Sequence, residues 1–239
     1  RRRVRKEPGR RLDFLVSSFA SALRLIGALS PDVFDAVRTS LSVSAGATVF
    51  AALLGIPLGL LVGLSDFPLK RLVVTVLNTL MAVPTVVVGL LVYGFLSRQG
   101  PLGVLGLLFT PTAIAIGGTL LAAPIVANYS LASVRGADSR IVPTALTLGA
   151  GRLQAVATLI GEIRFGILAA VIAGFGRVVS EVGVAMMLGG NIRGYTRTMT
   201  TAIALETSKG EFAFGMALGI VLMMVALIVN LFLNLLQQR

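Results

Sequence analysis

The 239-residue chain contains no histidine and no cysteine. It therefore has no imidazole base, no thiolate nucleophile and no disulfide, and a zinc or iron site would have only carboxylates as ligands. The sequence also lacks a Gly-Lys dipeptide, so it has no phosphate-binding loop of the G-x-x-x-x-G-K-[ST] type. These absences argue against a metal or cofactor enzyme and exclude ATP hydrolysis through that loop. We expect no cofactor in this chain.

Charged residues are scarce, at 13% of positions, whereas 56% are hydrophobic and the mean hydropathy is +0.92. A soluble domain of this size could not bury so much apolar surface, so the composition predicts a membrane protein. A spanning helix needs roughly 20 mostly apolar residues. Residues 41–65, 72–97, 99–134 and 212–238 contain no Asp, Glu, Lys or Arg, and the run 165–190 contains only Arg177 and Glu181. The expected fold is an all-α, polytopic membrane helical bundle with five spans.

The formal net charge of +11 is distributed as a membrane protein requires, which argues against nucleic-acid binding. Residues 1–11 form a basic tail with seven cations and one Glu, and most of the remaining excess lies in short loops. The tail could bind lipid headgroups or set the orientation, or it could be a solvated terminus. No short apolar stretch with a small-residue cleavage site follows it, so a signal peptide is not expected.

The loop charges predict the orientation in the cell membrane. One side, formed by the loops at 66–71 and 131–164 and the C-terminus, carries seven Lys and Arg residues, and the other side carries four. The positive-inside rule therefore predicts a multi-pass protein with a cytosolic C-terminus.

The segment 12–30 leaves the number of spans open. Its polar residues Asp13, Ser17, Ser21 and Arg24 fall on one face of a helix, opposite an apolar face. This pattern predicts either an amphipathic helix at the membrane interface or a sixth span whose polar stripe faces the bundle.

Prolines and an ion pair within the apolar runs give candidates for a pore or gate. Proline breaks or kinks a helix, and ionisable residues in a span are costly unless they are paired. A spacing of four places Arg177 and Glu181 on one helical face, where each can neutralise the other. The candidates are Pro84, Pro124, Arg177, Glu181 and Gly183. The alternative roles are helix packing for the prolines and glycine, and joining neighbouring helices for the ion pair.

The segment 135–166 is moderately apolar, contains several charges and predicts two short helices. Asp138 or Ser139 can cap the first helix, Pro143 suits its first turn, and Gly149 suits the left-handed position that ends it. The second helix is expected from Arg152 to Arg164, with Leu153 and Leu159 on its apolar face. Two such helices would form a protruding two-helix knob, residues 138–164, although the segment could instead lie as an ordinary loop on the bilayer surface.

Thr144-Ala145 followed by Leu148-Gly149-Ala150 resembles the cytosolic EAA loop of the permease subunits of ABC importers. Ala145 and Gly149 match the motif, whereas Pro143 stands in place of the usual Glu, and Gly161-Glu162 in place of Leu-Pro. The resemblance implies the MetI-like permease fold and a coupling loop at 135–165 that contacts a separate ATPase. The residues assigned to this coupling are Pro143, Thr144, Ala145, Leu148, Gly149, Ala150, Arg152 and Glu162.

A second stretch resembles the signature of molybdate and tungstate permeases. It contains Glu-x-Gly at 181–183 and Gly-Asn-Ile-x-Gly-x-Thr-x-Thr at 190–198. Residues 78–81, 106–112 and 204–210 are most similar to the tungstate-type branch. The resemblance covers about residues 31–239, the expected permease transmembrane domain, and leaves the basic tail 1–11 and the segment 12–30 outside it.

This second resemblance implies an importer that moves an oxyanion by alternating access, with tungstate as the first candidate substrate. The implied partners are a second copy of the chain, ATPase subunits that hold ATP and magnesium, an extracytoplasmic substrate-binding protein and the lipid bilayer. The alternatives are a molybdate or sulfate ABC permease, or a stand-alone secondary transporter or channel. For a proton-coupled transporter, Glu181 is the one intramembrane carboxylate outside the loops.

The outer loop, residues 191–211, is rich in donors that suit an oxyanion. Its net charge is close to neutral, however, once Glu206 and Glu211 are counted. We therefore expect the loop to dock the external binding protein, or to have a structural role, and not to bind the anion directly. The candidate docking residues are Asn191, Arg193, Thr196, Arg197 and Thr198.

Overall fold

The computed structural model describes residues 19–20, 22–24, 27 and 30–237, and no β-strand occurs among them. The helices and their bounds are α2 (Pro31–Leu64), α3 (Lys70–Ala82), α4 (Thr85–Leu96), α5 (Pro111–Gly136), α6 (Ile141–Thr147), α7 (Arg152–Glu162), α8 (Arg164–Val179), α9 (Gly183–Gly189), α10 (Met199–Lys209) and α11 (Phe212–Gln237), with a 3-10 turn, η1, at Gly103–Leu105. The all-α prediction is confirmed. The basic tail 1–11 and most of the segment 12–30 lie outside the described residues.

The centre of the bundle is the close contact between α2 and α5, and glycine makes it possible. A Cβ added at Gly55 would lie 2.8 Å from the carbonyl oxygen of Ala123, and one added at Gly59 would lie 2.7 Å from the Cβ of Ser130. Neither distance leaves room for a side chain, so the two backbones approach closely, as is common for small residues in membranes. The hydroxyl of Thr119 on α5 also donates to the carbonyl oxygen of Ala47 on α2, at 3.3 Å.

Within the described part of the chain, three helices are long and apolar enough to cross a membrane: α2, α5 and α11. The runs 41–65 and 212–238 correspond to α2 and α11, although α2 begins ten residues earlier, at Pro31. Two bent pairs, α3 with α4 and α7 with α8, bring the number to five if each pair is counted as one span. The prediction of five spans therefore holds only if these bent pairs cross the bilayer.

The run 72–97 is not one straight helix. Helices α3 and α4 meet at 96°, with Val83 and Pro84 between them in extended conformations. Proline lacks the amide hydrogen that continues a helix and disfavours helical geometry in the residue before it, which explains the break. The run 99–134 begins with irregular chain and η1, and its helix, α5, starts only at Pro111. Apolar composition alone overestimated the length of both helices.

The run 165–190 is also interrupted. Helix α8 ends at Val179, and α9 starts at Gly183 after a break of three residues that includes Glu181. The coupling segment and α8 are separate elements too, because α7 and α8 meet at 67° across the single residue Ile163.

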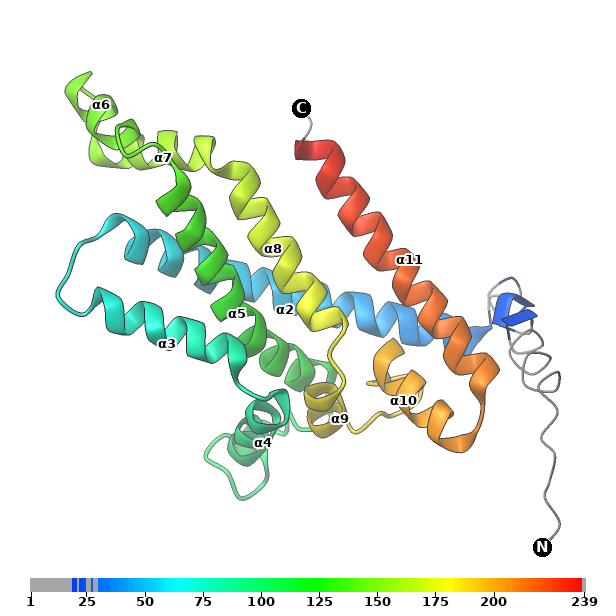
Figure 1. Cartoon of the computed structure of the whole chain (residues 1–239). Coiled ribbons are helices and arrows are strands. Elements are labelled where there is room, and N and C mark those ends of the chain that lie inside the picture. The colour runs from blue at the N-terminus through cyan, green and yellow to red at the C-terminus, as the bar shows by residue number, and fades with distance from the viewer. Residues whose placement is uncertain (1–18, 21, 25–26, 28–29, 238–239) are drawn as a thin grey trace, which may run out of the picture.

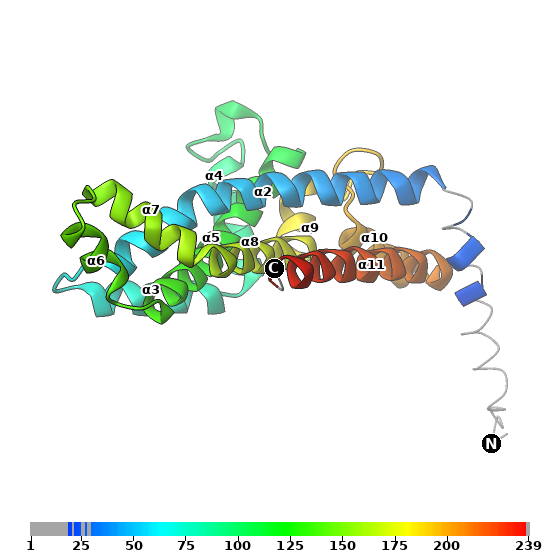
Figure 2. The same ribbon diagram turned by 90° about the horizontal axis from the view of Figure 1, so that it is seen from above.

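Figure 1 shows α6 and α7 at one end of the bundle, whereas α4, α9 and α10 lie towards the other end. Figure 2, seen from above, shows the same separation, with α6 and α7 at the left and α10 at the right. The two regions singled out by the sequence, the two-helix knob and the outer loop, therefore lie at opposite ends of the molecule.

Candidate functional site

The two-helix knob forms from local signals that the sequence carries. Helix α6 contains Pro143 in its first turn, and Gly149 follows in a left-handed conformation with φ of +88°. The amide of Ala150 donates to the carbonyl oxygen of Ala145 at 3.0 Å, which closes the turn. Helix α7 runs from Arg152 to Glu162, two residues shorter than expected. Both predicted helices and the left-handed stop at Gly149 are confirmed.

Asp138 orders the entry to α6 but does not cap the helix. Its carboxylate accepts the backbone amide of Arg140 at 2.9 Å and pairs with the guanidinium of Arg140 at 2.7 Å, and neither it nor Ser139 makes a side-chain cap bond to α6. This side-chain hydrogen bond lowers the pKa of Asp138 below its ordinary value and raises that of Arg140. The contact therefore holds at neutral pH.

A hollow of about 640 Å³ lies between the two helices of the knob. Of the residues assigned to coupling, Thr144, Ala145, Leu148 and Ala150 line it, whereas Pro143, Gly149, Arg152 and Glu162 do not. Sequence reasoning missed four lining residues: Asp138, Arg140, Ile141 and Thr158. Thr158 was missed because the expected apolar face of α7 was rotated from the observed one.

The buried residues of α7 are Ala155 and Leu159, and Leu153, expected on the same face as Leu159, is 87% exposed. Leu148, at the turn, is 82% exposed. Leu146 and Ile160 are exposed to a smaller extent. The knob thus presents several apolar side chains beyond the bundle, and such exposed side chains suit contact with another protein.

Arg177 and Glu181 form the ion pair that their spacing predicts. The Arg177 guanidinium donates to a Glu181 carboxylate oxygen at 2.7 Å, and the other carboxylate oxygen accepts the amide of Val184 at 3.2 Å. Glu181 is 7% exposed and Arg177 33%. The backbone oxygen of Glu181 also accepts the hydroxyl of Thr200, at 2.7 Å. Glu181 therefore joins the end of α8 to the starts of α9 and α10.

The remaining pore candidates occupy different places. Pro84 lies at the bend between α3 and α4, and Pro124 is buried within α5, which continues past it. A Cβ added at Gly183 would lie 3.2 Å from the hydroxyl of Thr85 and 3.4 Å from a Glu181 carboxylate oxygen. Gly183 is therefore close to Glu181 and to α4, whereas Pro124 is a buried residue inside α5.

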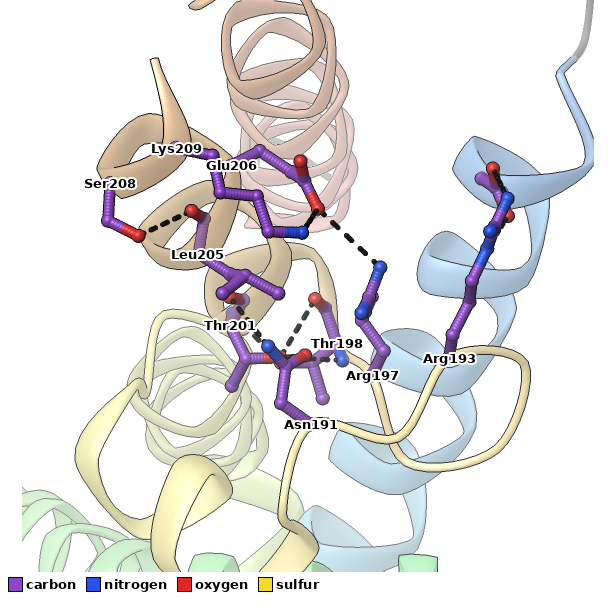
Figure 3. Close-up of polar contacts among 10 residues, drawn as sticks. Asn191, Arg193, Arg197, Thr198, Thr201, Leu205, Glu206, Ser208 and Lys209 are labelled. Atoms are coloured by element: carbon purple, nitrogen blue, oxygen red, sulfur yellow. Dashed lines mark hydrogen bonds and ion pairs between the residues drawn. The ribbon is translucent and has the colours of Figure 1, made fainter. Parts of the chain in front are cut away.

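The outer loop is held by its own hydroxyl groups (Figure 3). Thr198 caps α10 by accepting the amide of Thr201 at 3.3 Å, and the Thr201 hydroxyl donates to Asn191 at 3.0 Å. The Thr196 hydroxyl donates to the carbonyl oxygen of Gly189 at 2.5 Å. All three threonines are buried. Their hydroxyls stabilise the loop and are not free to meet an oxyanion.

Three charged residues of the outer loop, Arg197, Glu206 and Lys209, pair with one another, as Figure 3 shows. Arg197 and Lys209 lie 3.6 Å and 3.1 Å from Glu206, and Arg193 forms an ion pair with Asp32, at the start of α2. The hydrogen bond to Asp32 raises the pKa of Arg193. Asp32 was missed because it lies 161 residues from its partner. With Glu211, these residues line a hollow of about 350 Å³ that holds three cations and three carboxylates.

A family model described as "Binding-protein-dependent transport system inner membrane component" matches residues 55–239. The chain belongs to this family. Its relatives include the tungstate uptake system permease protein TupB of Peptoclostridium acidaminophilum, 43% identical over 88% of this permease and 92% of that protein. The tungstate uptake system permease protein TupB of Campylobacter jejuni is 40% identical over 88% of each chain. The permease is a transport subunit and not an enzyme.

Solved structures support the same fold. A bacterial ABC transporter involved in the import of the acidic polysaccharide alginate has a chain that superposes with a TM-score of 0.71. The match covers 92% of this permease and 83% of that chain at 21% sequence identity. The expected ABC importer permease fold, with several membrane-spanning helices, is therefore confirmed.

Proposed function

We propose that this permease imports tungstate and works as the membrane-spanning part of an ABC importer with separate ATPase subunits. The similarity to the two tungstate permeases, at 43% and 40% identity over 88% of the chain, is the observation that carries the choice of anion. The permease itself holds no nucleotide in this proposal. ATP and magnesium belong to the ATPase subunits.

The two-helix knob is the proposed contact with the ATPase. Its exposed Leu148 and Leu153 and the hollow lined by Thr144 and Ala145 give it both an apolar contact and a recess. In this proposal the knob and the C-terminus lie on the cytosolic side of the membrane, in agreement with the positive-inside rule. Of the other coupling residues, Ala150 also lines the recess, Pro143 and Gly149 mark the start and end of α6, and Arg152 and Glu162 are the first and last residues of α7.

The outer loop is the proposed docking surface for an extracytoplasmic binding protein, as the family description implies. The buried threonines keep the loop in one conformation, and the three cations and three carboxylates of its hollow give no net attraction for an anion. A rigid, charge-balanced surface suits a protein partner that recognises complementary charges. A second copy of the chain completes the importer, since closed symmetric assemblies are the rule for homo-oligomers.

Uptake of labelled tungstate by the transporter reconstituted with its ATPase and binding protein tests the proposal. We expect ATP-dependent uptake that an excess of unlabelled tungstate strongly reduces and that sulfate leaves unchanged. Stronger competition by molybdate or sulfate than by tungstate would reject tungstate as the substrate. If no ATPase subunit co-purifies with the permease, the proposal that separate ATPase subunits drive the transport is wrong.

A further inference from the structure

Two matching polar stripes face a groove between α3 and α5. On α3, Arg71, Thr75 and Asn78 recur at spacings of four and three, which is one face of a helix. On α5, Asn128 and Arg135 lie seven residues apart, again about two turns. Two hollows, of about 850 Å³ and 510 Å³, lie along these residues and share Val74 and Arg135 in their walls. They therefore form one continuous groove.

The groove has cations at its mouth and amides further in. Arg71 is the second residue of α3, and Arg135 is the last but one of α5, so both lie at the same end of the helix pair. Seven residues at 1.5 Å per residue place Asn78 and Asn128 each about 10 Å from the arginine of the same helix. Both helices thus repeat the same order, from guanidinium to amide, along the groove.

The arginines at the mouth keep their charge available. Neither Arg71 nor Arg135 forms an ion pair with any residue in the described part of the chain, and both side chains are exposed. Lys70 also lines the groove, and the one carboxylate there, Asp66, pairs with it at 3.0 Å. Three cations and one carboxylate leave the mouth with a net charge of +2, which matches a doubly charged oxyanion.

The side chain of Asn78 would be energetically unfavourable on a surface that faces lipid. Its side chain is exposed and makes no hydrogen bond within the described residues, although it lies two turns inside the helix pair. An unsatisfied polar group in hydrocarbon is costly, so such residues normally face protein or a water-filled cavity. Asn230 on α11 provides the contrast, because its amide donates to the carbonyl oxygen of Ala226 at 2.8 Å and its neighbours Leu227 and Ile228 are exposed and apolar.

We propose that the α3–α5 groove is the inner part of the translocation path and that the transported oxyanion leaves along it. Arg71 and Arg135 attract the anion at the mouth, and the amide of Asn78 donates to its oxygens further in. Guanidinium and amide groups are effective donors to oxyanions, and several weak sites in series let an ion pass without being trapped. This inference rests on the proposed function, because it needs an anion as the transported species.

Single cysteines test the groove directly, because the chain has none of its own. Cysteine is introduced at Asn78 or Val74 in the groove and, as the matched control, at exposed Leu227 on α11. The assembled transporter is placed in nanodiscs of phosphatidylcholine, open to reagent from both sides. It is then treated with a negatively and a positively charged methanethiosulfonate of similar size.

We expect both groove cysteines to react with the charged reagents at least ten times faster than the cysteine at Leu227, and the anionic reagent to be preferred. Arg71→Gln with Arg135→Gln should lower the ratio of anionic to cationic reaction rates by roughly tenfold at low salt, from two unit charges about 10 Å away in water. The transported oxyanion should slow the reaction in the groove. Groove cysteines as unreactive as the control would overturn the proposal.

The same measurement separates an ion path from a lipid site. If phosphatidylglycerol nanodiscs block the groove cysteines and no oxyanion protects them, the groove holds lipid headgroups and the proposal is wrong. Uptake gives an independent readout: Asn78→Leu should reduce it severalfold and Asn230→Leu should not. Equal uptake by these two variants would also contradict the proposal that the groove is part of the transport path. If the groove cysteines still prefer the anionic reagent in a transporter that does not import tungstate, the proposed substrate is wrong but the groove remains supported as an anion path.

Discussion

Replacing Gly149 with alanine should weaken binding of the ATPase to the two-helix knob. Gly149 has a φ of +88°, and a Cβ added there would meet no atom within 4 Å, so the expected cost comes from the backbone and not from crowding. A left-handed backbone costs a residue with a Cβ about 1–2 kcal/mol. This energy corresponds to a factor of roughly 5–30 in an equilibrium constant. The affinity of the ATPase subunit for the purified permease should fall by up to that factor.

Gly151 provides the matched control two residues away. Its φ is −70°, and a Cβ added there would lie 3.8 Å from the side-chain oxygen of Gln154, which is an ordinary contact. Both replacements reduce the freedom of the unfolded chain similarly, so the difference between them isolates the strain. Gly149→Asn should lie between Gly149→Ala and the parent, because asparagine tolerates the left-handed region better. Equal affinities for Gly149→Ala and Gly151→Ala in a titration with labelled ATPase would refute the reasoning.

Three further predictions concern the ion pair, the helix core and the effect of pH. Glu181→Ala should lower the free energy of unfolding in detergent by about 2 kcal/mol more than the double variant Arg177→Ala/Glu181→Ala does, because the single change leaves the partly buried Arg177 cation without its partner. Equal losses for the two variants would contradict a coupled pair. Gly59→Ala should destabilise the α2–α5 contact by about 1–3 kcal/mol, whereas Gly46→Ala, with nothing within 4 Å, should not; equal melting temperatures would contradict the close packing. The lowered pKa of Asp138 means that its contact with Arg140 is complete above the ordinary value of 3.8 and is lost only as the pH falls through the lower folded value. Asp138→Asn should therefore change ATPase binding by the same factor at every pH from 8 to 5, and a factor that varies within that range would contradict the assignment.

The parts of the fold that were predicted correctly depend on local signals. Pro143 and Gly149 mark the start and end of α6 through backbone geometry that each residue alone determines. Uncharged runs located α2 and α11 for a similar reason, since burial in lipid is a property of the segment itself. The charge spacing predicted the contact between Arg177 and Glu181 because both partners lie within one turn of chain.

The errors came from features that hydropathy does not report. An apolar run contains no information about where the backbone turns, so the break between α8 and α9 around Glu181 was missed. The ion pair between Asp32 and Arg193 joins residues 161 positions apart and depends on how α2 packs against the outer loop. The threonines at 196, 198 and 201 appeared as free donors because their burial follows only from the tertiary structure.

Helix α8 is joined to the knob at a bend of 67° at Ile163, which gives α8 the geometry of a lever arm. Sixteen residues make α8 about 24 Å long, and its far end is fixed to α9 and α10 through Glu181. A rotation of the knob by 10° that α8 follows rigidly would displace that far end by about 4 Å. Such a displacement exceeds the 2.7 Å between the Thr200 hydroxyl and the backbone oxygen of Glu181, the contact that joins this end of α8 to α10. Small movements at one end of the molecule would thus be large enough to rearrange polar contacts at the other.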